Sequence, residues 1–443
     1  MKLHGTMRIN PHFHLEIGGC DCTELAKDFG TPLYIMDEQL IRENCRGFVS
    51  AFSRGYPDTE IVYAGKAFLT TAMAKIIESE GLSLDVVSGG ELFTAYSAGF
   101  PMDRVYFHGN NKTPEEIDMA LEYGVGFIVV DNPSELEMLD KTASSLSVRQ
   151  KVLVRVSPGV AANTHQYIQT GQLDSKFGFP LYRDGAFQAV KRVLASKALA
   201  FEGLHCHIGS QIIDVSAFRT AAENMLSFAA RIWTELKAPV NVLNLGGGFG
   251  IYYTKEDRRM LPEDFSRPIT SSVKEALARY KLPAPRLVVE PGRYIVGDAG
   301  TTLYRVGSVK DIPEVRKYVF VDGGMADNPR PALYHARYRA TIANRMAKAE
   351  GEKITLAGKC CESGDILLKD IILPEIKCGD LIAVFSTGAY NYSMASNYNR
   401  LPKPAVVLVS DGKADLIVKR ESYRDVIRND IIPDRLKKTG HGW

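Results

Sequence analysis

Short apolar runs alternate with amphipathic, helix-like segments through the first two thirds of the sequence, and this alternation limits the fold more than any other feature. The runs lack the polar alternation of a strand with one face in solvent, so we expect strands buried on both faces, as in a parallel sheet. Eight such units over about 250 residues predict a (β/α)8 TIM-type barrel, with a doubly wound open sheet as the alternative. The runs are Ile61–Gly65, Ser83–Ser88, Arg104–Gly109, Gly126–Asp131, Lys151–Val156, Gly203–Gly209, Val240–Gly246 and Leu287–Gly292.

The pattern changes after about Gly297, where strand candidates follow one another without helical segments between them. They are Thr301–Gly307, Tyr318–Asp322, Ala332–Ala340, Lys353–Ala357, Asp380–Phe385, Ala405–Val409 and Ala414–Val418. A chain of 443 residues is too long for one ordinary core, so two domains are expected. We predict a barrel over residues 38–297, a C-terminal β-sandwich or β-barrel domain over 298–443, and an N-terminal segment, 1–37, whose strand joins the β domain.

The composition narrows the classes of function. A formal net charge of +2 provides no strong field for nucleic acid or for a membrane surface. The seven cysteines are odd in number and scattered, which is typical of a reduced, cytoplasmic chain. No apolar run has the length of a membrane span, and the first residues lack the apolar core of a signal peptide, so we expect neither.

Lys66 follows the first apolar run directly. Such an amine is either a solvated lysine at a strand end or a Schiff-base lysine whose pKa is lowered by burial. Because active sites of these barrels lie at the C-terminal ends of the strands, the other strand ends decide between the two. Those ends carry many polar side chains: Asp85, Ser88, His108, Asp131, Arg155, His205, His207, Ser210, Glu290 and Arg293.

Gly246–Gly250 follows the seventh run. Glycines allow a phosphate to approach backbone N–H groups, and barrel phosphate sites lie after strands seven and eight. Ser210 and Arg293 could add donors to the same phosphate. The alternative is an ordinary glycine-rich strand end.

His205 and His207 share one face of the sixth run. A metal pair would need more ligands, which Asp85 and Asp131 supply only in part, so we favour an imidazole stacked on a planar cofactor and predict no metal. Glu290 ends the eighth run, where a carboxylate can keep a pyridine nitrogen protonated and make the ring an electron sink. A surface ion pair is the alternative for Glu290.

A long connection, Ser157–Phe179, follows the fifth run and carries His165 and Ser175–Gly178. A loop of this length in a compact domain is usually functional. His12 and His14, near the N-terminus, are interpreted as incidental.

The order of these motifs resembles the alanine-racemase-like, fold-type III pyridoxal-phosphate decarboxylases over nearly the whole chain. The motifs are Tyr63–Lys66, His205–Gln211, Gly246–Gly250, Glu290–Arg293, Cys361–Asp365 and Gly388–Tyr390. Asp322–Met325 with Arg330–Tyr334, and Tyr392–Asn399, resemble the members that act on diaminopimelate rather than on ornithine. Asn391 departs from the pattern, which has a small glycine there.

The resemblance implies pyridoxal 5'-phosphate as cofactor and an obligate homodimer with shared active sites, in which β-domain groups enter the partner's barrel mouth. Lys66 is implied to hold the cofactor through a Schiff base, His207 to stack on its ring and Glu290 to meet its nitrogen. The implied cofactor-binding residues are Lys66, Asp85, His207, Ser210, Gly248, Glu290, Arg293 and Tyr390. The implied catalytic residues are Lys66, His207 and the proton donor Cys361, and the implied substrate-binding residues are Arg293, Arg330, Tyr334, Glu362 and Tyr390.

The implied reaction is decarboxylation of meso-2,6-diaminopimelate to L-lysine and carbon dioxide, the last step of lysine biosynthesis. A guanidinium fork suits the distal carboxylate of that substrate, and Glu362 suits its distal ammonium. One alternative is an amino-acid racemase of the same fold type, which the Cys361–Asp365 motif disfavours. Another is a decarboxylase of a different basic amino acid, which Arg330 disfavours. A regulatory homologue without activity would be expected to lack Lys66 or the thiol.

Overall fold

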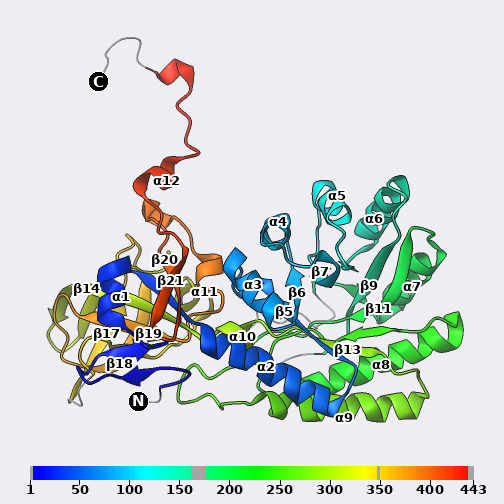
Figure 1. The fold of residues 1–443 in the computed structure, drawn as a ribbon, viewed down its shortest axis with the longest axis horizontal. Helices are drawn as coiled ribbons and strands as arrows, with labels where there is room; N and C mark the ends of the chain where they lie inside the picture. The colour runs from blue at the N-terminus through cyan, green and yellow to red at the C-terminus, as the bar shows by residue number, and fades with distance from the viewer. Residues whose placement is uncertain (1–2, 161–174, 347–349, 438–443) are drawn as a thin grey trace.

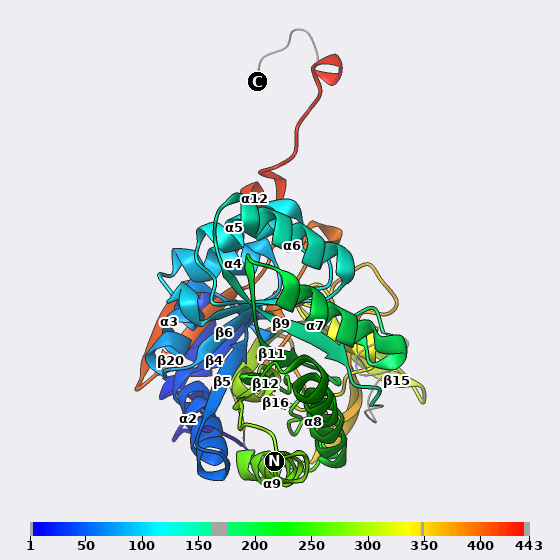
Figure 2. The same cartoon turned by 90° about the vertical axis from the view of Figure 1, so that its right-hand side faces the viewer.

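The computed structural model describes residues 3–160, 175–346 and 350–437, and its largest unit is a closed ring of eight parallel strands (Figures 1 and 2). The barrel strands are β5 (Thr59–Ala64), β6 (Ser83–Val86), β7 (Val105–Phe107), β8 (Phe127–Val130), β9 (Gln150–Ser157), β11 (Leu199–His205), β12 (Val242–Asn244) and β13 (Arg286–Val289). A two-residue strand, β10 (Phe179–Pro180), lies beside β9. β13 pairs with β5, and β8 pairs with β9, which closes the ring. Each strand overlaps one predicted apolar run, so the barrel prediction is confirmed over the open sheet.

Helices between the strands cover the outside of the barrel (Figure 2). They are α2 (Glu38–Gly55), α3 (Thr71–Ser79), α4 (Gly89–Ser97), α5 (Pro114–Glu122), α6 (Pro133–Ser145), α7 (Gly185–Ala195), α8 (Ser216–Leu236) and α9 (Pro262–Tyr280), and the single turn α10 (Arg293–Val296) follows β13. Several begin at side-chain caps, which satisfy otherwise unpaired N–H groups. At the start of α5, Thr113 and Glu116 form a capping box, and Pro114 occupies the first helical position. At the start of α4, Ser88 accepts a hydrogen bond from the backbone N–H of Glu91. The strand-end serine Ser88 therefore has a structural role as a helix cap.

The inside of the barrel is filled by side chains. A buried apolar cluster takes one residue from each of six strands: Val62, Tyr106, Val129, Leu153, Val242 and Val288. Such a layer makes the barrel a packed core rather than a pore. Polar groups that follow this layer lie at the carboxyl ends of the strands, where the barrel can hold a site.

The second unit is a mixed β sheet built from both ends of the chain. Its strands are β4 (Leu33–Asp37), β14 (Gly300–Ile312), β15 (Arg316–Val321), β16 (Ala340–Ile342), β17 (Gly351–Ala357), β18 (Ile366–Pro374), β19 (Leu381–Phe385), β20 (Ala405–Ser410) and β21 (Lys413–Val418). β4 lies between β14 and β20, so a strand from the N-terminal segment is central to this sheet. A small sheet of β1 (Arg8–Ile9), β2 (Leu15–Ile17) and β3 (Cys20–Asp21), with helix α1 (Cys22–Phe29), precedes it.

One strand prediction is wrong. The segment predicted as a strand over Ala332–Ala340 begins instead within helix α11 (Arg330–Tyr334) and continues through a turn before β16. Pro331 stands in the first turn of that helix, where its missing N–H costs nothing. His335 ends the helix in a left-handed conformation, with φ of 52°. The strand β18 has no counterpart in the prediction.

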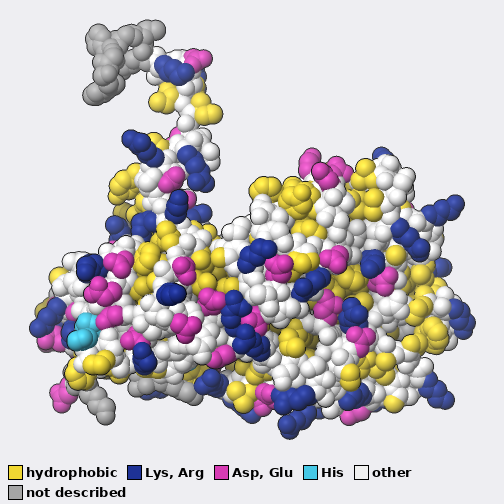
Figure 3. Space-filling model, viewed as in Figure 1, with side chains coloured by type: hydrophobic (Ala, Val, Ile, Leu, Met, Phe, Trp, Pro, Cys, Tyr) yellow, Lys and Arg dark blue, Asp and Glu magenta, His cyan; other side chains and the backbone are white. Residues whose placement is uncertain are grey.

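The remaining features concern the surface and the chain ends. After β21 the chain passes through α12 (Tyr423–Ile427) and extends away from the rest of the molecule (Figure 1). On the face drawn in Figure 3, basic and acidic side chains are interspersed. All seven cysteines are free thiols, and the described residues include no helix that is long and apolar enough to span a membrane. Part of the connection Ser157–Phe179, which was predicted to be functional, lies outside the described residues. His165 belongs to that part.

Candidate active site

A cavity of about 390 Å³ lies at the carboxyl ends of the barrel strands. Residues from both structural units line it. The sequence-predicted residues on its wall are Lys66, His207, Ser210, Glu290, Arg293, Arg330, Tyr334 and Tyr390. A single chain therefore brings most of the predicted site together.

Lys66 lies in a single helical turn, Gly65–Ala67, directly after β5. Its Nζ is 3.5 Å from Oδ2 of Asp85, whose carboxylate is fully buried. Burial lowers the pKa of Lys66, but nearby acidic groups, Asp85 foremost, outweigh burial, and the pKa is raised. The prediction of a lowered pKa is therefore wrong, because β6 lies next to β5 and brings a carboxylate against the amine.

Glu290 is buried and is held by three side chains from neighbouring strand ends. Nδ2 of Asn244 donates to Oε1 at 2.7 Å, while Nε2 of His108 lies 3.0 Å from Oε1 and Nε2 of His205 lies 3.3 Å from Oε2. Although burial alone would raise it, the pKa of Glu290 is held well below its usual range by His108 and His205. Burial lowers the pKa of His205 to about 3, so this ring is neutral and can donate to the carboxylate. Glu290 is thus an ionised acceptor at the cavity wall.

The same cluster has ligand atoms that a metal ion could use, since those of His108, His205 and Glu290 lie within 4.8 Å of one another. The amide of Asn244, however, directs an N–H at Glu290. A donor aimed at the carboxylate suits a hydrogen-bonded anion better than a metal ligand. We therefore interpret the cluster as a support for Glu290.

The glycine run after β12 packs tightly against backbone. A Cβ on Gly247 would lie 2.0 Å from the carbonyl oxygen of Glu290, and one on Gly248, where φ is +104°, would lie 2.3 Å from that of Gly209. The N–H of Gly247 donates to Nδ1 of His207 at 3.2 Å, which assigns the proton of that ring to Nε2. Burial lowers the pKa of His207 well below its usual value. The cavity thus has a neutral, oriented imidazole beside a backbone that excludes side chains.

Two buried arginines meet at one tyrosine hydroxyl. Nη1 of Arg293 donates to Oη of Tyr253 at 2.6 Å, and Nη1 of Arg330 donates to the same oxygen at 3.1 Å. Arg293 also donates to Oγ of Ser210 at 2.8 Å, and Arg330 to Oη of Tyr338 at 2.6 Å. Burial raises the pKa of Tyr253, but the two guanidinium charges outweigh it and the pKa is lowered. Tyr253 therefore connects the predicted phosphate side with the predicted substrate side.

Tyr390 and Tyr334 come from segments of the β domain but line the cavity of their own chain. The N–H of Tyr390 donates to the carbonyl oxygen of Ala67 at 2.8 Å, and its ring centroid lies 4.9 Å from the Arg293 guanidinium. The expectation that the β-domain groups reach only a partner's barrel is wrong for Tyr390, Tyr334 and Arg330. The reason is the short link from α10 into β14, which keeps the β domain beside its own barrel.

Cys361 and Glu362 are exposed and do not line the cavity that the described residues form. The N–H of Cys361 donates to Oδ1 of Asn399 at 2.6 Å. The hydroxyl of Tyr398 donates to Oε2 of Glu362 at 3.3 Å. The fold of one chain therefore holds this pair in an ordered loop but does not bring it to Lys66.

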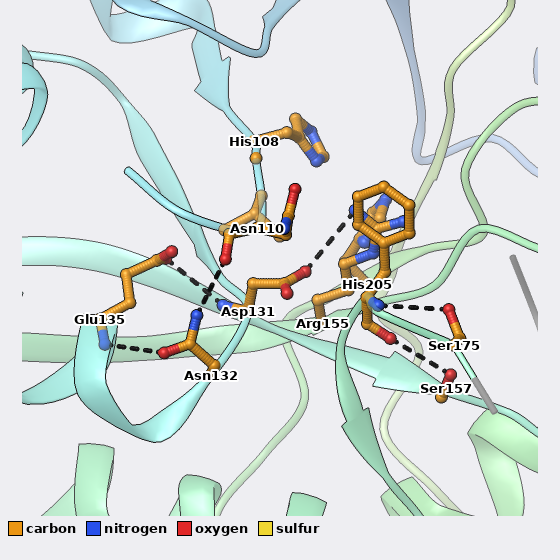
Figure 4. Close-up of polar contacts among 12 residues, drawn as sticks. His108, Asn110, Asp131, Asn132, Glu135, Arg155, Ser157, Ser175 and His205 are labelled. Atoms are coloured by element: carbon orange, nitrogen blue, oxygen red, sulfur yellow. Dashed lines mark hydrogen bonds and ion pairs between the residues drawn. The ribbon is translucent and has the colours of Figure 1, made fainter. Parts of the chain in front are cut away.

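A charged wall adjoins the cavity beyond β8 and β9 (Figure 4). Arg155 points toward Asp131, with 3.7 Å between Nη1 and Oδ1, and its guanidinium lies 4.4 Å from the ring centroid of Phe177. Nδ2 of Asn132 donates to the carbonyl oxygen of Asn110 at 3.0 Å. Arg155, Phe177 and Asn110 all line the cavity, so these contacts fix the shape of its wall.

Asn391 departs from the expected glycine and is fully buried. Its φ is −87°, a value that any residue adopts, so no glycine is required there. With its amide oriented to satisfy both ends, its NH2 group donates to the carbonyl oxygens of Ala389 at 3.0 Å and Thr387 at 3.2 Å. The loop therefore accommodates the asparagine.

Sequence reasoning missed Tyr253 and gave Asn244 no role. Asn244 is the last residue of β12, so the rule that barrel sites lie at strand ends could have found it. Tyr253 lies in a loop beyond the glycine run, where no periodicity marks its direction. Only the tertiary fold shows that it meets both arginines.

The residues present fit a pyridoxal phosphate group. Lys66 offers an amine and Glu290 an ionised carboxylate, while Ser210 and Arg293 offer hydrogen-bond donors on the same cavity wall. Both carboxylate oxygens of Asp85 and Nε of Arg293 are buried without a hydrogen-bond partner among the described residues. Buried polar atoms usually have partners, and a polar ligand in the cavity would supply one to Arg293, which lines it.

Comparison with known proteins agrees with this geometry. Residues 38–297, more than half of the chain, match the family model described as "Pyridoxal-dependent decarboxylase, pyridoxal binding domain". The barrel and its strand-end site thus define a pyridoxal-dependent decarboxylase of fold type III, which is a lyase.

The relatives narrow this class. The chain is 53% identical to the diaminopimelate decarboxylase of Bacillus subtilis over 97% of this chain and 98% of that protein, and 47% identical to that of Staphylococcus aureus over 96% and 99%. The crystal structure of the M. jannaschii diaminopimelate decarboxylase in complex with L-lysine has a TM-score of 0.90 at 37% identity and covers 97% of this chain and 99% of its own. The chain belongs to the diaminopimelate decarboxylase family.

Proposed function

We propose that the chain removes carbon dioxide from the D-centre of meso-2,6-diaminopimelate and forms L-lysine, the last step of lysine biosynthesis, with pyridoxal 5'-phosphate held on Lys66. The observation that carries the proposal is that Lys66, Glu290 and Arg330 line one cavity. The bound cofactor supplies an electron sink for the negative charge that remains when carbon dioxide leaves. The names of the relatives support the choice of substrate.

The barrel residues orient the cofactor. Glu290 stays ionised between His108 and His205, so it would accept a hydrogen bond from a protonated ring nitrogen of the bound cofactor. His207, neutral and oriented by Gly247, would pack against the cofactor ring. The other cofactor contacts that we propose come from Asp85, Ser210, Gly248, Arg293 and Tyr390.

Arg330 selects the far end of the substrate. Its guanidinium is buried, and two tyrosine hydroxyls orient it from behind. A distal carboxylate can receive the remaining N–H donors, and Tyr334 lies on the same wall. A substrate without that carboxylate would leave a buried cation poorly paired, which is costly. Lysine, ornithine and arginine are therefore poor substrates in this proposal.

Protonation requires a second copy of the chain. Because Cys361 and Glu362 lie outside the cavity of their own chain, we propose a homodimer in which each loop serves the other barrel. Cys361 of the partner subunit would be the proton donor in the reaction, and Glu362 of the partner subunit would bind the distal ammonium. His207 assists from its position over the ring.

We also propose a cytoplasmic location. The seven free thiols, two of them exposed at Cys361 and Cys378, suit a reducing compartment. A catalytic thiol in particular must stay reduced to donate a proton.

Release of carbon dioxide tests the proposal. The purified holoenzyme should release it from meso-diaminopimelate and not from lysine, ornithine or arginine at equal concentration. Borohydride reduction followed by mass spectrometry should locate the cofactor on the Lys66 peptide, with Lys112, a buried lysine outside the cavity lining, as the internal control. Equal turnover of ornithine, or a label on a different lysine, would refute the proposal.

A further inference from the structure

The last described segment, residues 419–437, forms an arm that projects from the body of the molecule in both ribbon views (Figures 1 and 2). The arm carries five large apolar side chains whose exposed fractions lie between 54% and 88%: Tyr423, Ile427, Ile431, Ile432 and Leu436. Yellow side chains are visible along it in Figure 3. A cluster of exposed apolar side chains of this kind marks a surface that another molecule covers.

The root of the arm is firmly attached. Nη2 of Arg420 donates to the carbonyl oxygens of Phe29 and Pro32, at 3.1 and 2.6 Å. Oε2 of Glu421 accepts from Nδ2 of Asn397 at 2.6 Å and from the N–H of Lys403 at 3.0 Å. The start of the arm is therefore fixed by the fold, while its large apolar side chains are exposed.

The arm also contacts the segment that supports the Cys361–Glu362 loop. Arg400 forms an ion pair with Asp430 on the arm and donates to the carbonyl oxygen of Val426 at 3.4 Å. The residue before it, Asn399, accepts the N–H of Cys361. A copy of the chain that receives the Cys361 loop in its cavity must therefore lie beside the arm.

We propose that the arm packs against a second copy of this chain, on the outer face of α4. α4 begins two residues after Val87, which lines the cavity, so this helix starts at the cavity rim. Phe93 and Tyr96 on α4 are 55% and 50% exposed, and Tyr96 stacks on Tyr123 with ring centroids 3.8 Å apart. The helix thus offers an aromatic surface to the aliphatic side chains of the arm, and a two-fold axis repeats the contact. The inference rests on the proposed shared active site.

The charges on the arm favour a protein surface over a lipid surface. Between its apolar residues the arm alternates both signs, with Arg424, Arg428, Arg435 and Lys437 against Asp425, Asp430 and Asp434. A helix that binds anionic membranes carries mainly basic residues on its polar face. A mixed rim around apolar anchors is typical of a protein interface.

A photo-crosslinking experiment tests where the arm binds. Benzoylphenylalanine replaces Ile431 in the full-length holoenzyme. 15N-labelled and unlabelled chains are purified separately, unfolded together and refolded with cofactor before irradiation. We expect a covalent product of twice the chain mass, with mixed-isotope peptides that join the arm to residues 76–104. The same photoreactive residue at Ile372, which is 64% exposed on β18, should give no such product. Attachment of the arm only to its own chain, to no chain, or to a different surface of the second copy overturns the proposal.

A second variant measures the strength of the contact. Ile431→Asp with Ile432→Asp should weaken self-association about tenfold or more in sedimentation velocity, because anchors at the centre of an interface dominate its free energy. Val315→Asp, which changes a residue that is 71% exposed on the β14–β15 turn, should leave association unchanged. Equal effects of the two variants refute the arm contact. Borohydride labelling and carbon dioxide release are measured on the same samples, so a chain that crosslinks as expected without decarboxylating refutes the proposed function alone.

Discussion

Replacement of Glu290 by glutamine tests the proposed role of its negative charge in keeping the cofactor's ring nitrogen protonated. Glu290→Gln keeps the size of the side chain but removes the charge that His108, His205 and Asn244 support at 2.7–3.3 Å. The amide cannot hold the proton on a pyridine nitrogen, so stabilisation of the negative charge left by carbon dioxide is lost. Loss of one buried charged partner costs roughly 3–4 kcal/mol, which corresponds to about two to three decades in turnover number.

The assay is steady-state release of carbon dioxide from meso-diaminopimelate, with cofactor content measured on the same samples. We expect a large fall in kcat with nearly full cofactor content. Glu135→Gln is the matched control, because Glu135 is also a buried carboxylate, paired with Lys112 at 2.9 Å and outside the cavity lining. It should lower the melting temperature without a comparable loss of kcat. A Glu290→Gln variant with wild-type kcat would exclude Glu290 from the proposed role.

Four further predictions follow from the same geometry. Arg330→Ala should lower kcat/KM for diaminopimelate by about two decades while cofactor content is kept, and an unchanged KM and kcat would make Arg330 structural. Burial lowers the pKa of His205 from 6.5 to about 3, so between these pH values only the unfolded chain binds a proton at this ring. The contribution of His205 to stability therefore falls as the pH drops from 6.5 toward 3, and urea unfolding of His205→Asn should show a flatter pH dependence. Dialysis against a chelator should leave activity intact with no bound transition metal by mass spectrometry, whereas loss of activity would make His108, His205 and Glu290 a metal site. Lys66→Ala and Cys361→Ala chains, each impaired alone, should regain about a quarter of wild-type activity when refolded together, because half of the random dimers contain one intact site; a lack of recovery despite confirmed exchange would refute the shared site.

The barrel was predictable because strands buried on both faces leave long apolar runs, and because helical segments between them specify parallel pairing. The position of Lys66 followed from the same periodicity, since it stands directly after the first run. Its raised pKa did not follow, because Asp85 comes from the neighbouring strand and its approach depends on the register of β5 and β6. The helix α11 was missed since its five residues are too few for helical periodicity to appear.

Chain assignment is a further limit of sequence reasoning, and Tyr390 and Cys361 illustrate it. Both lie in the β domain, and both belong to motifs that resemble the same family. Only the fold distinguishes the places of the two residues. Tyr390 is hydrogen-bonded to Ala67 beside the cavity, while Cys361 lies in an exposed loop and is hydrogen-bonded to Asn399. A sequence motif indicates that a residue takes part in a site. It does not indicate which subunit of an oligomer provides that residue.

This separation divides the proposed reaction between two chains. One chain holds the amine of Lys66, the ionised Glu290 and the two arginines in a single cavity, which is enough to bind the cofactor and the distal carboxylate. The loop that carries the proposed proton donor Cys361 is connected instead to the arm, through the backbone contact of Cys361 with Asn399 and the ion pair of Arg400 with Asp430. Because the loop and the arm are connected in this way, association would bring the proton donor into place in the same step that covers the apolar arm. An isolated chain would then keep its cofactor while it lacks the group that completes the reaction, so turnover would depend on assembly rather than on cofactor binding.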